Sequence, residues 1–208
     1  MLRLGPLFKT FAATLPTIAE REIALYQRHF ELLQDWNQHI GLVSRKSIDQ
    51  AFHIHYADSI WISECAFPFV KGEVFDVGTG AGFPGIIFAI RYPDVKVTLF
   101  EKLLKKQSFL TAVLSQLDLP NVTLKGVLPD GRLKGLVLAR AVFPRDKLFP
   151  LFSRQLEAGS ILVANQGGKA EVEPVAKGFH KLLEKTYTLP LDHGNRRVEI
   201  LEAVRLSK

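Results

Sequence analysis

One stretch, residues 73 to 101, limits what this chain can fold into, because it places closely spaced glycines between two apolar segments. The short run Val74–Val77 is typical of a strand that is buried on both faces of a parallel sheet. The glycine-rich run Gly78–Gly82 lets the backbone turn tightly and approach a ligand, since a Cβ atom there would obstruct it. Pro84 suits the first turn of a helix, and the next strand ends at the acidic Glu101. The stretch therefore predicts a βαβ nucleotide-binding unit.

The composition is that of an ordinary globular protein. The 208 residues suit one domain with a small appendage, and the apolar fraction of 47% leaves enough side chains for a substantial core. A single cysteine, Cys65, excludes an internal disulfide and a multi-cysteine metal site, so a reducing cytoplasm is the expected location and a core role the expected one. No segment has the length and apolar character of a signal peptide or a membrane span. The net charge of +6 favours a polyanionic partner.

Residues 1–70 are predicted to form a helical extension packed on a core of residues 71–208, which is a Rossmann-like α/β fold with a mostly parallel sheet. Apolar residues at helical spacing predict one helix over residues 17–39, with Thr17 and Glu20 in a capping-box pattern. A second helix is predicted to end before Pro68. It runs over residues 47–67.

Alternating apolar segments and turns predict the remaining elements. The expected strands are 122–127, 136–138 and 161–164, the expected helices are 102–117, 145–156 and 171–185, and a closing antiparallel pair is expected at 186–191 and 197–204. The loop Asn165–Lys169 does not match a phosphate-binding P-loop, so a plain turn is the preferred interpretation. Pro129 and Asp130 follow a strand at the sheet edge where open α/β sheets bind ligands.

Two histidines, His53 and His55, suggest a metal site only weakly. Residues two apart do not share a helix face, and no acidic or cysteine partner lies at a known ligand spacing. No metal is therefore expected. Asp58 and Ser59 are interpreted as a pair on the surface of the helix.

The nature of the cofactor depends on Asp76. The run Gly80–Gly85 fits the dinucleotide pattern G-x-G-x-x-G, and Glu101 lies near the distance expected for a ribose-binding acid. A dinucleotide would place its pyrophosphate over this turn, where the carboxylate of Asp76 would repel it. S-adenosylmethionine has no phosphate but has an ammonium, a sulfonium and a ribose diol. Asp76 favours its cationic part, directly or through water, and Glu101 can accept from both ribose hydroxyls, so a methyltransferase is preferred over a dehydrogenase.

The chain resembles the bacterial ribosomal RNA small-subunit methyltransferase G family, also called glucose-inhibited division protein B. The matching residues are Trp36-Asn37, His55-Tyr56-Ala57-Asp58-Ser59, the run from Asp76 to Gly85, Lys105 with Phe109-Leu110, Leu119 with Asn121-Val122, and Arg140-Ala141. The Phe83-Pro84-Gly85 continuation of the glycine loop is the most distinctive of these, and the resemblance spans residues 30 to 205.

The resemblance implies a class I methyltransferase fold, S-adenosylmethionine as cofactor, and guanine N7 of 16S ribosomal RNA, or of the small subunit, as target. It also implies that Gly78, Phe83, the Pro129-Asp130 backbone region and Arg140 contact the cofactor or border its methyl group. Gly80, in the same glycine-rich run, is assigned to the cofactor as well. Because N7 has a free lone pair and no proton, catalysis would depend mainly on positioning and desolvation.

Three cations are assigned substrate roles. Arg140 is the candidate catalytic residue, which would orient the base or its phosphate, although a buried salt bridge to Asp130 or Asp76 is the alternative. Lys105 and Lys106 are candidate phosphate contacts, and the alternative for them is a solvated helix surface.

The chain departs from the family pattern on the edge expected to face RNA. Gly41-Leu42-Val43 replaces Asn-Leu-Thr, Ile54 replaces an arginine, Leu128-Pro129-Asp130 lacks an arginine, and Gln166-Gly167 replaces Lys-Gly. Two alternatives therefore stay open: a non-catalytic paralogue that binds RNA or cofactor, and a class I methyltransferase that acts on another substrate.

Overall fold

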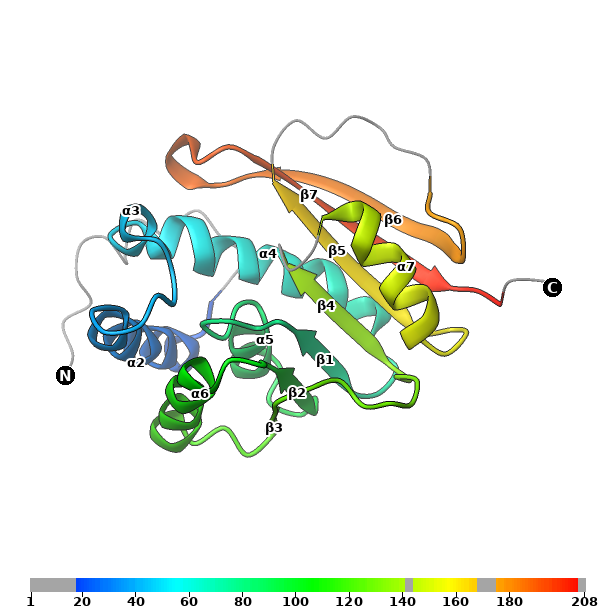
Figure 1. Cartoon of the computed structure of the whole chain (residues 1–208). Helices are drawn as coiled ribbons and strands as arrows, with labels where there is room; N and C mark the ends of the chain where they lie inside the picture. Colours follow the sequence, from blue (N-terminus) through cyan, green and yellow to red (C-terminus); the bar gives the residue numbers. More distant parts are fainter. Residues whose placement is uncertain (1–17, 141–143, 168–174, 206–208) are drawn as a thin grey trace.

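A computed structural model describes residues 18–140, 144–167 and 175–205. These residues form a seven-stranded sheet in the order β3-β2-β1-β4-β5-β7-β6 (Figure 1). The strands are β1 Val74–Val77, β2 Val97–Phe100, β3 Val122–Lys125, β4 Leu136–Arg140, β5 Ile161–Gly167, β6 Phe179–Thr188 and β7 Asn195–Ala203. Strands β1 to β5 are parallel, and β7 pairs antiparallel with both β5 and β6. The α/β fold class predicted from the sequence is confirmed.

Up to residue 156 the helices lie where the apolar spacing predicts them, with one interruption. They are α2 Glu20–Asn37, α3 Arg45–Ile48, α4 Ala57–Ala66, α5 Gly85–Arg91, α6 Leu104–Leu117 and α7 Arg145–Gln155, with 3-10 turns at Phe67–Phe69 (η2) and Pro190–Asp192 (η3). The single helix predicted over 47–67 is divided, because a π-helical segment, η1 (Phe52–Tyr56), precedes α4. At the start of α2, Glu22 and not Glu20 accepts from the backbone N–H of Ala19, and Thr17 lies outside the described residues.

Two apolar layers cover the two faces of the sheet. Alternate strand residues such as Val74 and Leu138 pack against α2, α4, α5 and α6, while Phe75 and Val137 pack against α7. In Figure 1, α7 lies in front of the sheet, and α4 and α5 lie behind it. The N-terminal helices thus share one core with the sheet, and the division of the chain at residue 70 stays a prediction.

The helix predicted over residues 171–185 is wrong for its described part. Phe179–Thr188 forms the edge strand β6, which pairs with β7 along its length. The segment His180–Lys185 contains good helix formers, but pairing with β7 and burial of Phe179 outweigh this local preference. The predicted antiparallel pair is confirmed, and its first strand begins earlier than expected. Residues 165–167, predicted as a loop, continue β5.

Candidate cofactor and substrate site

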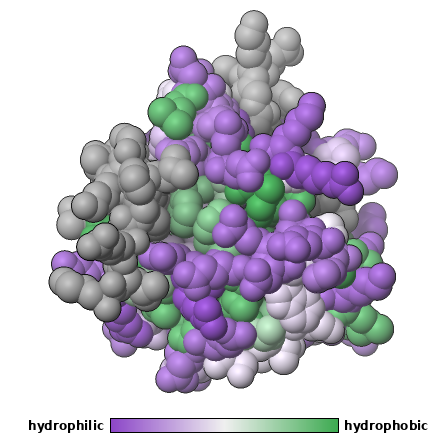
Figure 2. Space-filling model, turned by 90° about the vertical axis from the view of Figure 1, so that its left-hand side faces the viewer, coloured by the Kyte–Doolittle hydropathy of each residue, from purple (hydrophilic) through white to green (hydrophobic). Residues whose placement is uncertain are grey.

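A cavity of about 410 Å³ opens at the carboxyl ends of β1 and β2. Its wall consists of Val77, Gly78, Phe100, Glu101, Lys102, Leu103, Lys106, Gly126, Val127 and Leu128. Open α/β sheets bind ligands outside the carboxyl ends of their strands, so this is where a cofactor is expected. The parallel strands end at the left of Figure 1, and Figure 2 turns that side toward the viewer. Outside the grey atoms the face is mainly hydrophilic, with apolar side chains gathered near its centre.

The glycine loop has a backbone that other residues rarely adopt. Gly78, Gly80 and Gly82 have φ angles of 70°, 61° and 87°, in the left-handed region that glycine tolerates best. A Cβ atom on Gly82 would also lie 2.6 Å from Cγ1 of Ile86. Gly78 lies on the cavity wall, so the loop brings backbone to the ligand as the sequence predicts. Pro84 immediately precedes α5 rather than entering its first turn.

Asp76 lies beneath the loop and does not line the cavity. Its carboxylate is buried and accepts the backbone N–H of Gly85 at 2.8 Å, which ties β1 to the start of α5. Burial raises the pKa of Asp76 from 3.8 to about 6, against the lowering effects of Thr79, the Gly85 N–H and Arg140. Asp76 therefore cannot contact a ligand in this cavity directly. It could act on a cationic ligand only by holding the loop in place or through the electrostatic field of its carboxylate.

Glu101 holds the other side of the loop and faces the cavity. One carboxylate oxygen accepts the Gly80 N–H at 3.1 Å, and the other accepts the Leu103 N–H at 2.9 Å. Although only 6% of the residue is exposed, it forms part of the cavity wall. Carboxylate oxygens have further lone pairs, so Glu101 can accept hydroxyl groups of a ligand while it orders the loop.

Of the other residues predicted to contact a ligand, some line the cavity and some do not. Lys106 lines the cavity, and Lys105 is exposed outside it. Pro129 and Asp130 are exposed and do not line the cavity; the Pro129 carbonyl accepts from Gln155 at 2.9 Å. The exposed side chains of Leu103 and Val127 add apolar surface to the wall.

Phe83 and Arg140 belong to a neighbouring cluster. Phe83 is buried, stacks on His55 with ring centroids 5.4 Å apart, and lies below the Arg140 guanidinium, 5.4 Å from its centroid. Arg140 donates to the carboxylate of Asp58 at 3.1 Å. The salt bridge given as the alternative role of Arg140 thus forms with Asp58, and not with Asp130 or Asp76.

The interpretation of Asp58 and Ser59 as a surface pair is also wrong. Both are buried, at 3% and 0% exposure, because α4 turns this face toward the sheet. Ser59 donates to the carbonyl of His55. Ionised groups are seldom buried without a partner, and Arg140 supplies the partner of Asp58.

His29 connects helix α2 to the glycine loop. Its Nε2 lies 3.0 Å from the Ala81 carbonyl, and its Nδ1 lies 2.6 Å from the Tyr56 hydroxyl. Because a carbonyl only accepts, Nε2 carries the proton and Nδ1 accepts from Tyr56. Burial lowers the pKa of His29 to about 4, and burial followed by the charges of Arg140 and Arg196 lowers the pKa of His55 to about 3. Both imidazoles are therefore neutral at physiological pH.

The lowered pKa values of His29 and His55 predict acid destabilisation. Because the unfolded chain protonates them near pH 6.5 and the folded chain does not, the free energy of unfolding falls as pH drops below 6.5. The raised pKa of Asp76 has the opposite sign and adds stability as pH falls from about 6 toward 3.8. Two histidines against one aspartate leave a net loss on the order of 2 kcal/mol between pH 7 and pH 5, which urea titrations at the two pH values would measure.

Two variants separate His29 from the general effect of acid. His29→Gln should remove most of the net loss between pH 7 and pH 5, because Asp76 offsets much of the contribution that His55 leaves. The exposed His39, replaced in the same way, should leave the loss unchanged. Equal losses in the two variants would show that His29 does not cause the acid sensitivity.

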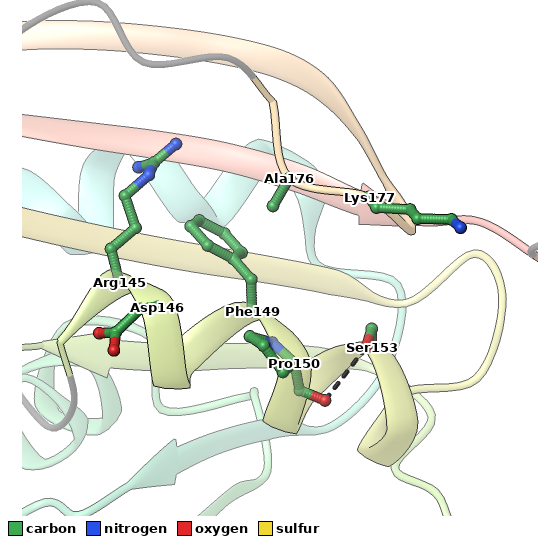
Figure 3. Close-up of a pocket in the computed structure, with 7 residues that line it drawn as sticks. All are labelled: Arg145, Asp146, Phe149, Pro150, Ser153, Ala176 and Lys177. Carbon is green, nitrogen blue, oxygen red and sulfur yellow. Dashed lines mark hydrogen bonds between the residues drawn. The ribbon is translucent and has the colours of Figure 1, made fainter.

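A second cavity, of about 660 Å³, lies on the side of the sheet that α7 covers. Its lining residues, drawn in Figure 3, are Arg145, Asp146, Phe149, Pro150 and Ser153 of α7 with Ala176 and Lys177, which precede β6; of these, Arg145 and Phe149 extend from α7 toward β6. No residue of the glycine loop or of the end of β2 contributes to it, so it is separate from the candidate cofactor site.

Several observations bear on the other sequence-based expectations. Among the described residues, no group of three or more His, Cys, Asp or Glu side chains could hold a metal ion. Nor is any helix in these ranges long and apolar enough to cross a membrane. Cys65 is buried, and burial raises its thiol pKa, which fits the expected core role.

Sequence reasoning missed two of the residues that build the site. Leu103 lines the cavity just after Glu101, and its position beside that acid could have indicated it. His29 carries no recognisable motif, and only the folded chain brings it to Ala81.

Comparison with known proteins identifies similar chains. Residues 22–200 match the family described as GidB, rRNA small subunit methyltransferase G. A relative from Solibacter usitatus, named ribosomal RNA small subunit methyltransferase G, is 32% identical and covers 91% of this chain and 98% of its own. One with the same name from Acetivibrio thermocellus is 31% identical and covers 89% and 82%.

Two solved structures show the same fold at low sequence identity. A Klebsiella pneumoniae protein, provisionally described as an O-methyltransferase, superposes with a TM-score of 0.60 at 11% identity and covers 95% of this chain and 96% of its own. The Escherichia coli protein yhhF, provisionally described as a methyltransferase, gives 0.54 at 16% identity over 70% and 83%. At such identities the likeness concerns the fold alone.

Proposed function

We propose that this chain, which belongs to the rRNA small subunit methyltransferase G family, methylates small-subunit ribosomal RNA at guanine N7 with S-adenosylmethionine as methyl donor. Membership of the family makes the chain a methyltransferase. The observation that carries the finer proposal is the cavity at the ends of β1 and β2, in which Glu101 bridges the glycine loop and the start of α6.

The residues of this cavity fit S-adenosylmethionine. Glu101 can accept the two ribose hydroxyls, and the apolar side chains of Leu103 and Val127 suit an adenine ring. Gly78 lets backbone approach the remainder of the molecule. The carboxylates of Asp76 and Glu101 would oppose a pyrophosphate, which disfavours a dinucleotide. When bound, this cofactor supplies an electrophilic methyl group on a sulfonium.

The proposed reaction needs orientation more than proton transfer. Guanine N7 has a lone pair on the major-groove edge and no proton to lose before attack. The chain's task is to hold the base in line with the methyl group and to exclude water. Arg140, at the carboxyl end of β4, is the proposed residue that orients the base or its phosphate, and Lys106 with Lys105 is proposed to contact phosphates on the same edge.

Labelled methyl transfer tests this proposal. Small subunits from cells that lack this protein should accept a labelled methyl group, and nucleoside analysis should recover it as 7-methylguanosine. Subunits from cells that contain the protein should accept much less, because the position is already occupied. Label on another nucleoside would overturn the N7 assignment.

The two alternatives give different outcomes in the same experiment. A non-catalytic paralogue would bind the cofactor in calorimetry but transfer no label to subunits or naked RNA. A methyltransferase for protein or small molecules would label a component that survives ribonuclease treatment. A ribosomal RNA substrate would place the protein in the cytoplasm.

A further inference from the structure

We propose that Asp58 and Tyr187 are positioning residues that fix the Arg140 guanidinium beside the methyl-transfer site, an inference that rests on the proposed function. Asp58 lies on α4, Tyr187 on the edge strand β6 and Arg140 at the end of β4. The tip of the closing hairpin and the N-terminal helices therefore converge on one side chain of the parallel sheet.

The contacts form a continuous chain of hydrogen bonds. Arg140 donates to one oxygen of Asp58 at 3.1 Å, and the Tyr187 hydroxyl donates to the other oxygen at 2.6 Å. The side-chain amide of Asn165 then donates to the Tyr187 oxygen at 2.9 Å. Arg196 lies 4.0 Å from the same Asp58 oxygen that Tyr187 uses. Each oxygen of Asp58 thus accepts a hydrogen bond from a different donor. These two bonds fix the orientation of the carboxylate that holds Arg140.

Burial makes this arrangement rigid. The Asp58 side chain is 4% exposed and that of Arg140 is 17% exposed, and Tyr187 is buried against Trp61, with ring centroids 5.6 Å apart. Phe83 supports the guanidinium from below. Since a guanidinium has five donors and Asp58 takes one, Arg140 keeps donors for an acceptor such as a phosphate oxygen or a base edge.

The Tyr187 hydroxyl keeps its proton and so always acts as a hydrogen-bond donor to Asp58. Burial, followed by the charge of Asp58, raises the pKa of Tyr187 far above its ordinary value. The phenol therefore stays protonated at physiological pH. Loss of its hydroxyl removes one of the hydrogen bonds that orient the Asp58 carboxylate, and it does not change the charge of the cluster.

The chain contains a matched control for this triad. On α2, the Tyr26 hydroxyl donates to Glu22 at 3.0 Å, and Arg91 of α5 donates to the same carboxylate at 2.7 Å. Tyr26 is buried as Tyr187 is. This second tyrosine–carboxylate–arginine triad contributes no residue to the cavity wall, so a Tyr26→Phe variant removes the same kind of bond away from the site.

The positioning itself is measurable without substrate. In ¹⁵N-labelled protein, the heteronuclear NOE of the Arg140 Nε–H should indicate a rigid side chain in the wild type and in Tyr26→Phe. Tyr187→Phe and Asp58→Asn should both make it mobile, and urea titration would confirm that each variant is folded. A rigid Arg140 in folded Tyr187→Phe would overturn the proposal.

The effect on the reaction is tested with labelled small subunits. Tyr187→Phe should lower kcat by about tenfold or more, because small displacements of a positioning group cost up to a hundredfold, while the Kd for S-adenosylmethionine changes less than about twofold. Tyr26→Phe should shift the urea midpoint about as much as Tyr187→Phe does, but it should leave kcat unchanged. In an Arg140→Lys background, Tyr187→Phe should cause no further loss.

The outcomes separate this inference from the proposed function. Two results would overturn the positioning role. One is an equal kcat in Tyr187→Phe and Tyr26→Phe. The other is that Tyr187→Phe lowers kcat in the Arg140→Lys background by the same factor as in the wild type. A wild-type protein that transfers no methyl group to any subunit would overturn the proposed function instead, and the NOE of Arg140 would then decide whether Asp58 and Tyr187 hold it.

Discussion

Gly85→Ala is expected to destabilise the protein by about 3 kcal/mol or more and to abolish cofactor binding. A Cβ atom at this position would lie 2.5 Å from an Asp76 carboxylate oxygen and 2.8 Å from its Cβ, and it would also meet Leu99. Asp76 and Leu99 are buried in adjacent strands of the sheet, so neither can move aside. The start of α5 would have to shift, and the Gly85–Asp76 hydrogen bond would be lost with it.

Gly72→Ala provides the control for this prediction. A Cβ atom on Gly72 would meet no heavy atom within 4 Å, so this variant should unfold at nearly the wild-type urea concentration. Urea unfolding followed by circular dichroism compares the two variants, and calorimetry with S-adenosylhomocysteine compares their cofactor binding. If Gly85→Ala were as stable as Gly72→Ala, helix α5 could not be as closely packed on β1 as described.

The part of the site that the sequence predicts is the part built from local chain. Gly78 and Glu101 belong to one βαβ unit, in which glycine spacing and an acid at a strand end have direct physical consequences. The role of Asp76 was only partly predicted. Its position at the strand end is evident from the sequence, but burial beneath α5 depends on how closely Gly85 lets the helix approach.

The substrate side could not be derived in the same way, because its contacts join distant residues. Asp58 and Arg140 are 82 positions apart, and Asp58 and Tyr187 are 129 apart. No spacing rule relates such positions, so the sequence alone predicts Asp58 on the helix surface. The helix predicted over residues 171–185 failed for a related reason. Its described part contains helix-forming residues, and only the pairing with β7 makes it part of the edge strand.

Glu101→Gln is expected to weaken S-adenosylmethionine binding by about a hundredfold. Glutamine keeps the shape of the side chain but loses the charge that strengthens hydrogen bonds from hydroxyl groups. Its NH₂ group would also face the N–H of Gly80 or of Leu103, which both donate to Glu101. One of these two backbone hydrogen bonds, to the glycine loop or to the start of α6, would be lost, so the ligand contact and the order of the site would weaken together. Calorimetric titration measures the Kd directly.

Glu73→Gln is the matched control, and the choice of ligand separates the two possible roles of Glu101. Glu73 accepts from the Thr98 hydroxyl at 2.5 Å and precedes β1 at the end away from the cavity, so its variant should bind as the wild type does. Because S-adenosylmethionine and S-adenosylhomocysteine share the ribose and differ at sulfur, a hydroxyl acceptor at position 101 requires both to weaken by the same factor. If only S-adenosylmethionine weakened, the carboxylate would act on the sulfonium charge, and the assignment of Glu101 to the ribose would be wrong.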